Sequence, residues 1–183
     1  MPKTIYRILT LGKSGVGKTS LLESMVYGRV FKTRPPPPTI EDIYECTIET
    51  EHGSKERVHI YDTSGQSGVM DDKMKQRYFS SADGIVLVYS CNNCRESFTY
   101  IKDMRQQIEA MRGEHMPMVV VGTTMDSGRE DNGESRSVAI WAHTQSLQHY
   151  RVALEKRLAI SEPFVWIMSR IAAGGKRFLP RKN

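Results

Sequence analysis

Apolar residues along the chain gather in short segments whose spacing predicts strands and helices in alternation. Continuous apolar runs, typical of strands buried in a parallel sheet, cover Tyr6–Leu11, Ile85–Tyr89 and Met118–Val121. Apolar residues recur with helical spacing in residues 19–27, 96–112, 135–148 and 160–172. A weaker strand, Tyr150–Leu154, precedes the last of these helices. This order predicts an α/β fold with a doubly wound sheet.

Two further segments alternate apolar and polar residues, as strands with one buried face do. They are Ile43–Glu51 and Arg57–Tyr61, joined through His52-Gly53-Ser54, and they predict an antiparallel hairpin at one edge of the sheet. The expected sheet therefore has six strands, mostly parallel, in a three-layer sandwich. We expect one domain over residues 1–172 and a short basic tail over residues 173–183.

Four consecutive prolines, Pro35–Pro38, stiffen the segment ahead of this hairpin. Such a run is also typical of SH3 or WW ligands. We favour a constrained surface loop because of the residues that follow it.

The composition adds few constraints: 183 residues, 39% hydrophobic and 26% charged, with a net charge of +5. This mild basicity permits an acidic partner or a membrane surface. A nucleic-acid-binding protein would carry a denser basic stripe, so we expect no nucleic acid. No apolar run is long enough to span a bilayer. Proline at position 2 and the lack of a cysteine near the end argue against a lipid anchor.

Three cysteines without a signal peptide indicate a reducing compartment, so we expect a cytoplasmic protein. Cys91 and Cys94 form a single Cys-x-x-Cys motif. It has no second ligand pair for zinc. It is expected to follow a strand rather than to open a helix, as a redox motif would, so we interpret it as structural.

The strongest chemical signal is the segment GKSGVGKT, which matches the phosphate-loop pattern G-x-x-x-x-G-K-[ST] between a predicted strand and a predicted helix. Glycines allow the backbone amides to point at a phosphate, and the helix N-terminus adds positive charge. Lys18 is expected to meet the β- and γ-phosphates and to assist catalysis, while the Thr19 hydroxyl binds Mg²⁺. The expected phosphate contacts are Gly12, Lys13, Ser14, Gly15, Val16, Gly17, Lys18, Thr19 and Ser20.

Two later segments supply the remaining groups that a nucleoside triphosphate needs. Asp62 ends a strand beside the phosphate loop and is expected to hold Mg²⁺, while the Gly65 amide meets the γ-phosphate. Gln66 follows, where its amide side chain can orient an attacking water. Thr39 lies on a loop from which its hydroxyl can close on Mg²⁺ and its amide on the γ-phosphate, both released when that phosphate is lost.

At these three segments the sequence resembles the Ras superfamily of P-loop NTPases. PTIED at residues 38–42 is similar to the Ras effector loop, and DTSGQ at residues 62–66 to its DTAGQ. The similarity spans about residues 4–172. A closer resemblance is to the kappaB-Ras group, the NF-kappa-B inhibitor-interacting Ras-like proteins, through EDIY at 41–44, ADG at 82–84, EPF at 162–164 and the ending RKN.

The kappaB-Ras resemblance implies a GTP- or GDP-binding, magnesium-dependent regulator of signalling. Such proteins bind IkappaB-type inhibitor proteins, restrain NF-kappa-B signalling, work with the Ral GTPase-activating complex and carry no prenyl group. We therefore expect a monomeric cytoplasmic regulator with slow GTP hydrolysis.

The guanine-reading motif N-K-x-D departs from the Ras pattern. Asp126 is retained and can accept two hydrogen bonds from guanine, but Thr123 and Thr124 replace the asparagine and lysine. Threonine is expected to be too short to bridge back to the phosphate loop, which weakens nucleotide binding by about 1–3 kcal/mol. The S-A-K base loop is not recognisable over residues 152–156.

Ser14 stands where Ras has glycine, and it is expected to crowd the meeting point of Gln66 with an activating protein's arginine. This favours slow hydrolysis. Two alternatives stay open: a conventional switch, favoured by Gln66, and a nucleotide-independent scaffold, disfavoured by the retained phosphate and metal residues. A P-loop kinase is disfavoured because no arginine-rich lid is found.

Overall fold

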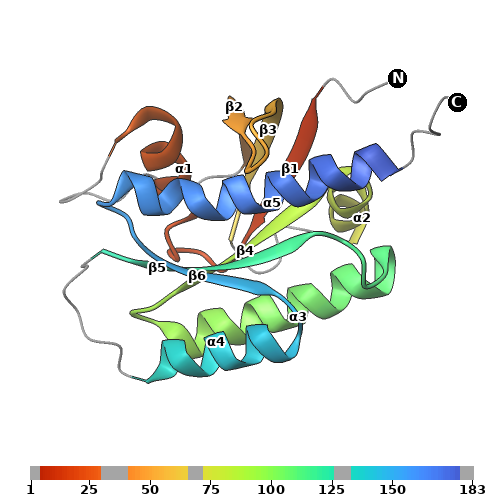
Figure 1. Cartoon of the computed structure of the whole chain (residues 1–183). Helices are drawn as coiled ribbons and strands as arrows, with labels where there is room; N and C mark the ends of the chain where they lie inside the picture. Colours follow the sequence, from red (N-terminus) through yellow and green to blue (C-terminus); the bar gives the residue numbers. More distant parts are fainter. Residues whose placement is uncertain (1–4, 30–40, 66–71, 126–132, 178–183) are drawn as a thin grey trace, which may run out of the picture.

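Six strands form one sheet in the order β2-β3-β1-β4-β5-β6, as Figure 1 shows for this computed structural model. The structure describes residues 5–29, 41–65, 72–125 and 133–177. All neighbouring strands run parallel except β2 and β3, which pair antiparallel. The strands are β1 Tyr6–Leu11, β2 Glu41–Glu49, β3 Lys55–Thr63, β4 Gly84–Ser90, β5 Met118–Thr124 and β6 Gln148–Ala153. The predicted α/β sheet with one antiparallel edge strand is confirmed.

Helices cover both faces of the sheet and complete three layers (Figure 1). They are α1 Lys18–Tyr27, α2 Asp72–Ser81, α3 Cys94–Arg112, α4 Glu134–Thr144 and α5 Arg157–Arg177. Helices α1 and α5 bury one face of the strands, and α2, α3 and α4 bury the other. Alternate residues of β4 enter the two cores, Val86 and Val88 on the α1/α5 side and Ile85 and Leu87 on the other.

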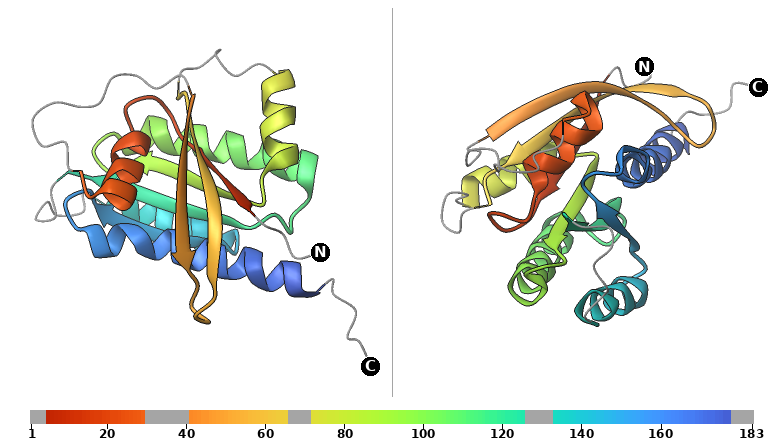
Figure 2. Two further views of the ribbon diagram at one scale, coloured as in Figure 1. Left: turned by 90° about the horizontal axis from the view of Figure 1, so that it is seen from above. Right: turned by 90° about the vertical axis from the view of Figure 1, so that its left-hand side faces the viewer.

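The β2–β3 hairpin reaches past the body of the sheet, and its turn crosses α5 (Figure 2). There the Glu51 N–H donates to Ser169 Oγ at 2.9 Å. On β2, Tyr44 points inward and is 3% exposed, whereas Ile43 is 49% exposed. The Tyr44 hydroxyl donates to Glu23 Oε1 at 3.1 Å, which ties β2 to α1. The outer edge of the sheet therefore presents Ile43, not Tyr44, to solvent.

Helix α2 was not predicted, and its sequence explains why. Over DKMKQRYFSS only Tyr78 and Phe79 are buried, so no apolar stripe of helical period is visible. The helix is fixed from outside: Arg112, at the end of α3, donates to the Phe79 carbonyl at 2.7 Å and the Ser80 carbonyl at 2.5 Å. These are carbonyls that a helix C-terminus leaves without intrahelical donors.

The ends of several other elements also differ from the prediction. Helix α3 begins at Cys94 rather than at residue 96. Helix α4 ends at Thr144 rather than at residue 148, and β6 begins at Gln148 rather than at Tyr150. Helix α5 continues to Arg177, into the segment expected to be a tail. None of the helices in the described part of the chain is long and apolar enough to cross a bilayer.

Candidate phosphate-binding site

The loop between β1 and α1 is shaped by glycines and closes against the start of the helix. Gly17, at the N-cap of α1, has φ 93°, a left-handed conformation that a larger residue adopts only with strain. The Leu21 N–H donates to the Gly17 carbonyl at 2.8 Å, which starts the helix. The loop thus presents an α-helix N-terminus, where backbone N–H groups and the helix dipole favour an anion.

The ammonium group of Lys18 is buried at the centre of this loop. The residue is 6% exposed, and Nζ donates to the Gly12 carbonyl at 2.8 Å and the Lys13 carbonyl at 3.2 Å. Burial lowers the pKa of Lys18 to about 8, and the nearby Asp62 carboxylate opposes this shift. A buried cation held in this way is stabilised by an added anion, so the loop fits a phosphate group.

The two expected magnesium ligands in the described residues lie together. Thr10 of β1 pairs with Asp62 of β3, which brings the end of β3 beside the loop. Thr19 Oγ1 then donates to Asp62 Oδ2 at 2.6 Å. A hydroxyl and a carboxylate are the hard oxygen ligands that Mg²⁺ prefers, so this donor set fits that ion.

Gly65 follows β3 and packs directly on the phosphate loop. The Ser14 N–H donates to the Gly65 carbonyl at 2.8 Å. A Cβ atom on Gly65 would lie 2.3 Å from Ser14 N and 2.6 Å from Lys18 Nζ, so this position tolerates no side chain. The segment expected to sense the γ-phosphate is therefore in contact with the loop expected to bind it.

Thr123 bridges to the phosphate loop, which contradicts our expectation that threonine is too short to do so. Its Oγ1 donates to the Val16 carbonyl at 2.5 Å and also lies 3.2 Å from the Tyr89 carbonyl oxygen. The bridge forms because β5 carries Thr123 to within hydroxyl reach of the loop at the carboxyl end of the sheet. The penalty expected for an unmade buried hydrogen bond at this point does not arise.

Sequence reasoning missed two contacts around the loop. Lys13 forms an ion pair with Glu96 in the first turn of α3, and this cation lowers the pKa of Glu96. The Leu154 N–H donates to the Thr124 carbonyl at 2.9 Å, and Leu154 is buried beside Gly17. Neither pair is visible from sequence spacing, because their members are far apart along the chain.

Three expected site residues, Thr39, Gln66 and Asp126, lie outside the described residues. Among the residues that the structure describes, no cluster of three or more histidine, cysteine, aspartate or glutamate side chains could hold a metal. The loop, Asp62 and Gly65 are therefore the part of the expected site whose geometry is established.

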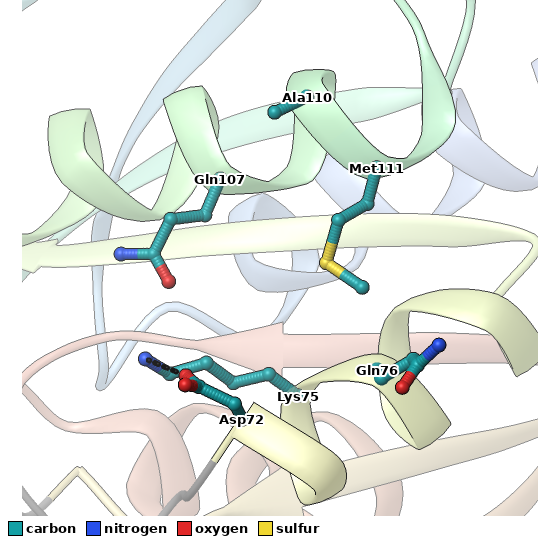
Figure 3. A pocket seen from close by; sticks show the side chains of 6 residues that line it. All are labelled: Asp72, Lys75, Gln76, Gln107, Ala110 and Met111. Atoms are coloured by element: carbon teal, nitrogen blue, oxygen red, sulfur yellow. Dashed lines mark ion pairs between the residues drawn. The ribbon is translucent and has the colours of Figure 1, made fainter.

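Among the residues that the structure describes, hollows also lie away from the phosphate loop. One, of about 350 Å³, lies between α2 and α3, where Lys75 pairs with Asp72 at 3.7 Å and Met111 faces them (Figure 3). The other, of about 340 Å³, lies between α1, β2 and α5 and is lined by Met25, Cys46 and Phe164 among others.

The fold and the phosphate loop agree with the comparison to known proteins. The family model described as "Ras family" matches residues 7–173. The chain belongs to the Ras family. This Ras-family chain is 33% identical to the human NF-kappa-B inhibitor-interacting Ras-like protein 1 over 168 residues, 91% of this chain and 85% of the relative. It is 32% identical to the human NF-kappa-B inhibitor-interacting Ras-like protein 2 over 182 residues, which are 97% of this chain and 93% of the relative.

A similar protein from Drosophila melanogaster, named NF-kappa-B inhibitor-interacting Ras-like protein, is 32% identical over 171 residues, 91% of this chain and 84% of the relative. The predicted resemblance to the kappaB-Ras group is thereby confirmed. Membership of the Ras family implies binding of a guanine nucleotide, usually with Mg²⁺.

The Thr123 bridge gives a test of the base side of the site. Thr123→Val keeps the shape of the side chain but leaves the Val16 carbonyl without its donor, so we expect nucleotide binding to weaken by about 1–3 kcal/mol. Fluorescent GDP titration measures this change. Thr123→Ser, which keeps the hydroxyl, serves as the control and should bind within about threefold of the wild type. Equal affinity of the valine variant and the wild type would show that the bridge does not support binding.

Proposed function

We propose that this chain is a GTP- or GDP-binding regulator that holds its nucleotide with Mg²⁺ through the phosphate loop. The observation that carries this proposal is the convergence of buried Lys18 with the Thr19–Asp62 pair at one point beside the loop. Lys18 would neutralise phosphate oxygens, and Thr19 and Asp62 would hold the metal. Bound Mg²⁺ supplies charge neutralisation between the phosphates.

Three residues beyond the described ranges complete the proposed site. Thr39 would add a metal ligand, Asp126 would accept the guanine N–H groups, and Gln66 would orient water. Apart from Ser14, whose N–H is held by the Gly65 carbonyl, the N–H groups of residues 13–20 would face the phosphates, with Gly65 at the γ-phosphate. The Gly65–Ser14 contact supports this assignment, because it places Gly65 against the loop.

The regulatory part of the proposal concerns the partner. The two human relatives described above are named for interaction with NF-kappa-B inhibitors. We infer that this chain also binds IkappaB-type inhibitor proteins, in the cytoplasm and as a monomer, and that it restrains NF-kappa-B and Ral signalling, the latter with the Ral GTPase-activating complex. The surface we assign to the partner is the outer edge of β2, because an exposed edge strand can pair with an extended segment.

Slow hydrolysis follows from Ser14 in the same proposal. Ser14 is exposed at the mouth of the loop, and its N–H group is bound to Gly65, the residue before Gln66. A side chain there would crowd the space that an activating arginine needs. A conventional switch that cycles rapidly remains the second candidate, because the chain retains Gln66.

The nucleotide proposal is tested by what purified protein carries. Nucleotide released by denaturation and separated by chromatography should be GDP or GTP, close to one equivalent per chain. Lys18→Ala should carry less than about a tenth of that amount, because the phosphates lose their buried cation. Lys55→Ala removes an exposed lysine at the end of β3 opposite Asp62, and it is the matched control, expected to retain its nucleotide. Full occupancy in the Lys18 variant would contradict the proposed site.

The partner surface is tested at Ile43. Ile43→Asp places a charge on the exposed edge of β2 and should weaken binding to a purified NF-kappa-B inhibitor protein at least about tenfold. Ile140→Asp, at a residue 59% exposed on α4 beside the opposite edge of the sheet, is the matched control. Calorimetry measures both, with bound nucleotide determined alongside. Equal affinities of the two variants would exclude the β2 edge as the partner surface.

The hydrolysis proposal is tested by Ser14→Gly. Removing the side chain should raise the single-turnover rate in the presence of a Ras-family GTPase-activating protein at least about tenfold, a fraction of the 10³ to 10⁵ that an arginine finger supplies. The affinity for GDP should stay unchanged, which would show that Ser14 limits access of the activating arginine and not nucleotide binding. Fast GTP hydrolysis by the wild-type protein in the presence of the activating protein would contradict the proposal that Ser14 slows the reaction.

A further inference from the structure

The Cys-x-x-Cys motif opens a helix, contrary to the expectation on which its structural interpretation depended. Cys91 follows β4 directly, and Cys94 is the first residue of α3. Between them Asn92 and Asn93 form an exposed turn. The dipole of a helix favours a thiolate at its N-terminus, whereas burial in apolar surroundings opposes ionisation.

The turn between the two cysteines brings their backbones within the range that a disulfide bond needs. Residues at the ends of a four-residue turn have Cα atoms less than about 7 Å apart. A disulfide bond needs a Cα separation of roughly 4.4 to 6.8 Å. Neither cysteine is in a disulfide, and they are only 7% and 2% exposed, beside the exposed turn.

Both cysteine side chains lie in the same buried cluster, on the side of the sheet that α2, α3 and α4 cover. The Tyr89 hydroxyl is fully buried and lies 3.0 Å from His149 Nε2. Tyr89 belongs to this cluster as well, and burial raises the pKa of its hydroxyl. The two cysteines that flank the turn between β4 and α3 therefore pack into the same core as Tyr89.

We propose that Cys91 and Cys94 form a reversible disulfide on exposure to a peroxide, which makes the motif an oxidative modification site. One thiolate attacks the peroxide O–O bond, giving a sulfenic acid and releasing water after protonation. The second thiolate then attacks that sulfur and displaces hydroxide, which leaves as water. Overall, two thiols and one hydrogen peroxide give one disulfide and two waters.

The motif is connected to the phosphate loop through two short contacts. The Cys91 N–H donates to the Thr123 carbonyl at 2.9 Å, and Thr123 Oγ1 donates to the Val16 carbonyl. Drawing Cys91 towards Cys94 pulls on Thr123 and loosens its hold on Val16. Oxidation therefore speeds the release of bound nucleotide. This second step rests on the proposed nucleotide-binding function, whereas formation of the disulfide does not.

The disulfide is tested on the folded full-length chain in a Cys46→Ser background, which leaves only the two motif thiols. Treatment with hydrogen peroxide should lower the intact mass by about 2 Da, the two thiol hydrogens, and dithiothreitol should restore it. Cys91→Ser and Cys94→Ser should each abolish the loss. An unchanged mass, or oxygen addition without this loss, would overturn the proposal. The wild-type chain, oxidised and digested without reduction, should give a peptide that contains both cysteines and is about 2 Da lighter than its reduced form. This test depends on no variant.

The connection is tested by release of fluorescent GDP from the same samples. We expect oxidised protein to release it at least about fivefold faster than reduced protein, and dithiothreitol to reverse the change. The double variant Cys91→Ser, Cys94→Ser should not respond to peroxide. A complete mass loss with an unchanged release rate would overturn the connection while the disulfide stands. A chain that binds no GDP even when reduced would instead contradict the nucleotide-binding proposal.

Discussion

Burial of the Lys18 ammonium group beneath its own loop is the interaction on which the site depends. The ammonium is held by the carbonyls of Gly12 and Lys13 and is removed from water, at a depth where an isolated charge is unfavourable. This arrangement requires the left-handed turn at Gly17, the start of α1, and the neighbouring carboxylate of Asp62. The central strands β1 and β3 supply that carboxylate through their register. A site built in this way is organised for a polyanion before one binds.

The two sides of the loop are held by different partners, and this separates two functions. On one side Gly65 packs on Ser14, at the end where a γ-phosphate would lie. On the other side Thr123 bonds Val16, at the carboxyl ends of β5 and β4, where a base would lie. Changes on the first side should act on hydrolysis and on discrimination between GTP and GDP. Changes on the second should act on affinity, and the Cys91–Cys94 motif adjoins this second side.

The sheet and the phosphate loop were predictable because their signals are local. Buried runs such as Ile85–Tyr89 define strands by composition alone, and the loop motif carries its own spacing. Helix α2 was not predictable, since it is fixed by Arg112 from another helix and buries only two side chains. The inward orientation of Tyr44 agrees with the alternation of Tyr44, Cys46 and Ile48, which marks the buried face of β2.

The Thr123 bridge was predicted wrongly for a different reason. Threonine is shorter than asparagine, but whether its hydroxyl reaches the phosphate loop also depends on where β5 ends relative to that loop. The start of α3 was also placed two residues late, because Cys94 carries no signal of helix initiation. The roles expected for Thr39, Gln66 and Asp126 stay predictions.

Calorimetric titration of nucleotide-free protein with GDP, with Mg²⁺ and with Mg²⁺ removed by a chelator, addresses the central claim most directly. The account predicts one site per chain with a dissociation constant in the micromolar range or below, about −8 kcal/mol or stronger, and weaker binding without the metal. A folded protein that takes up neither GDP nor GTP at millimolar concentration in the presence of Mg²⁺ would contradict it.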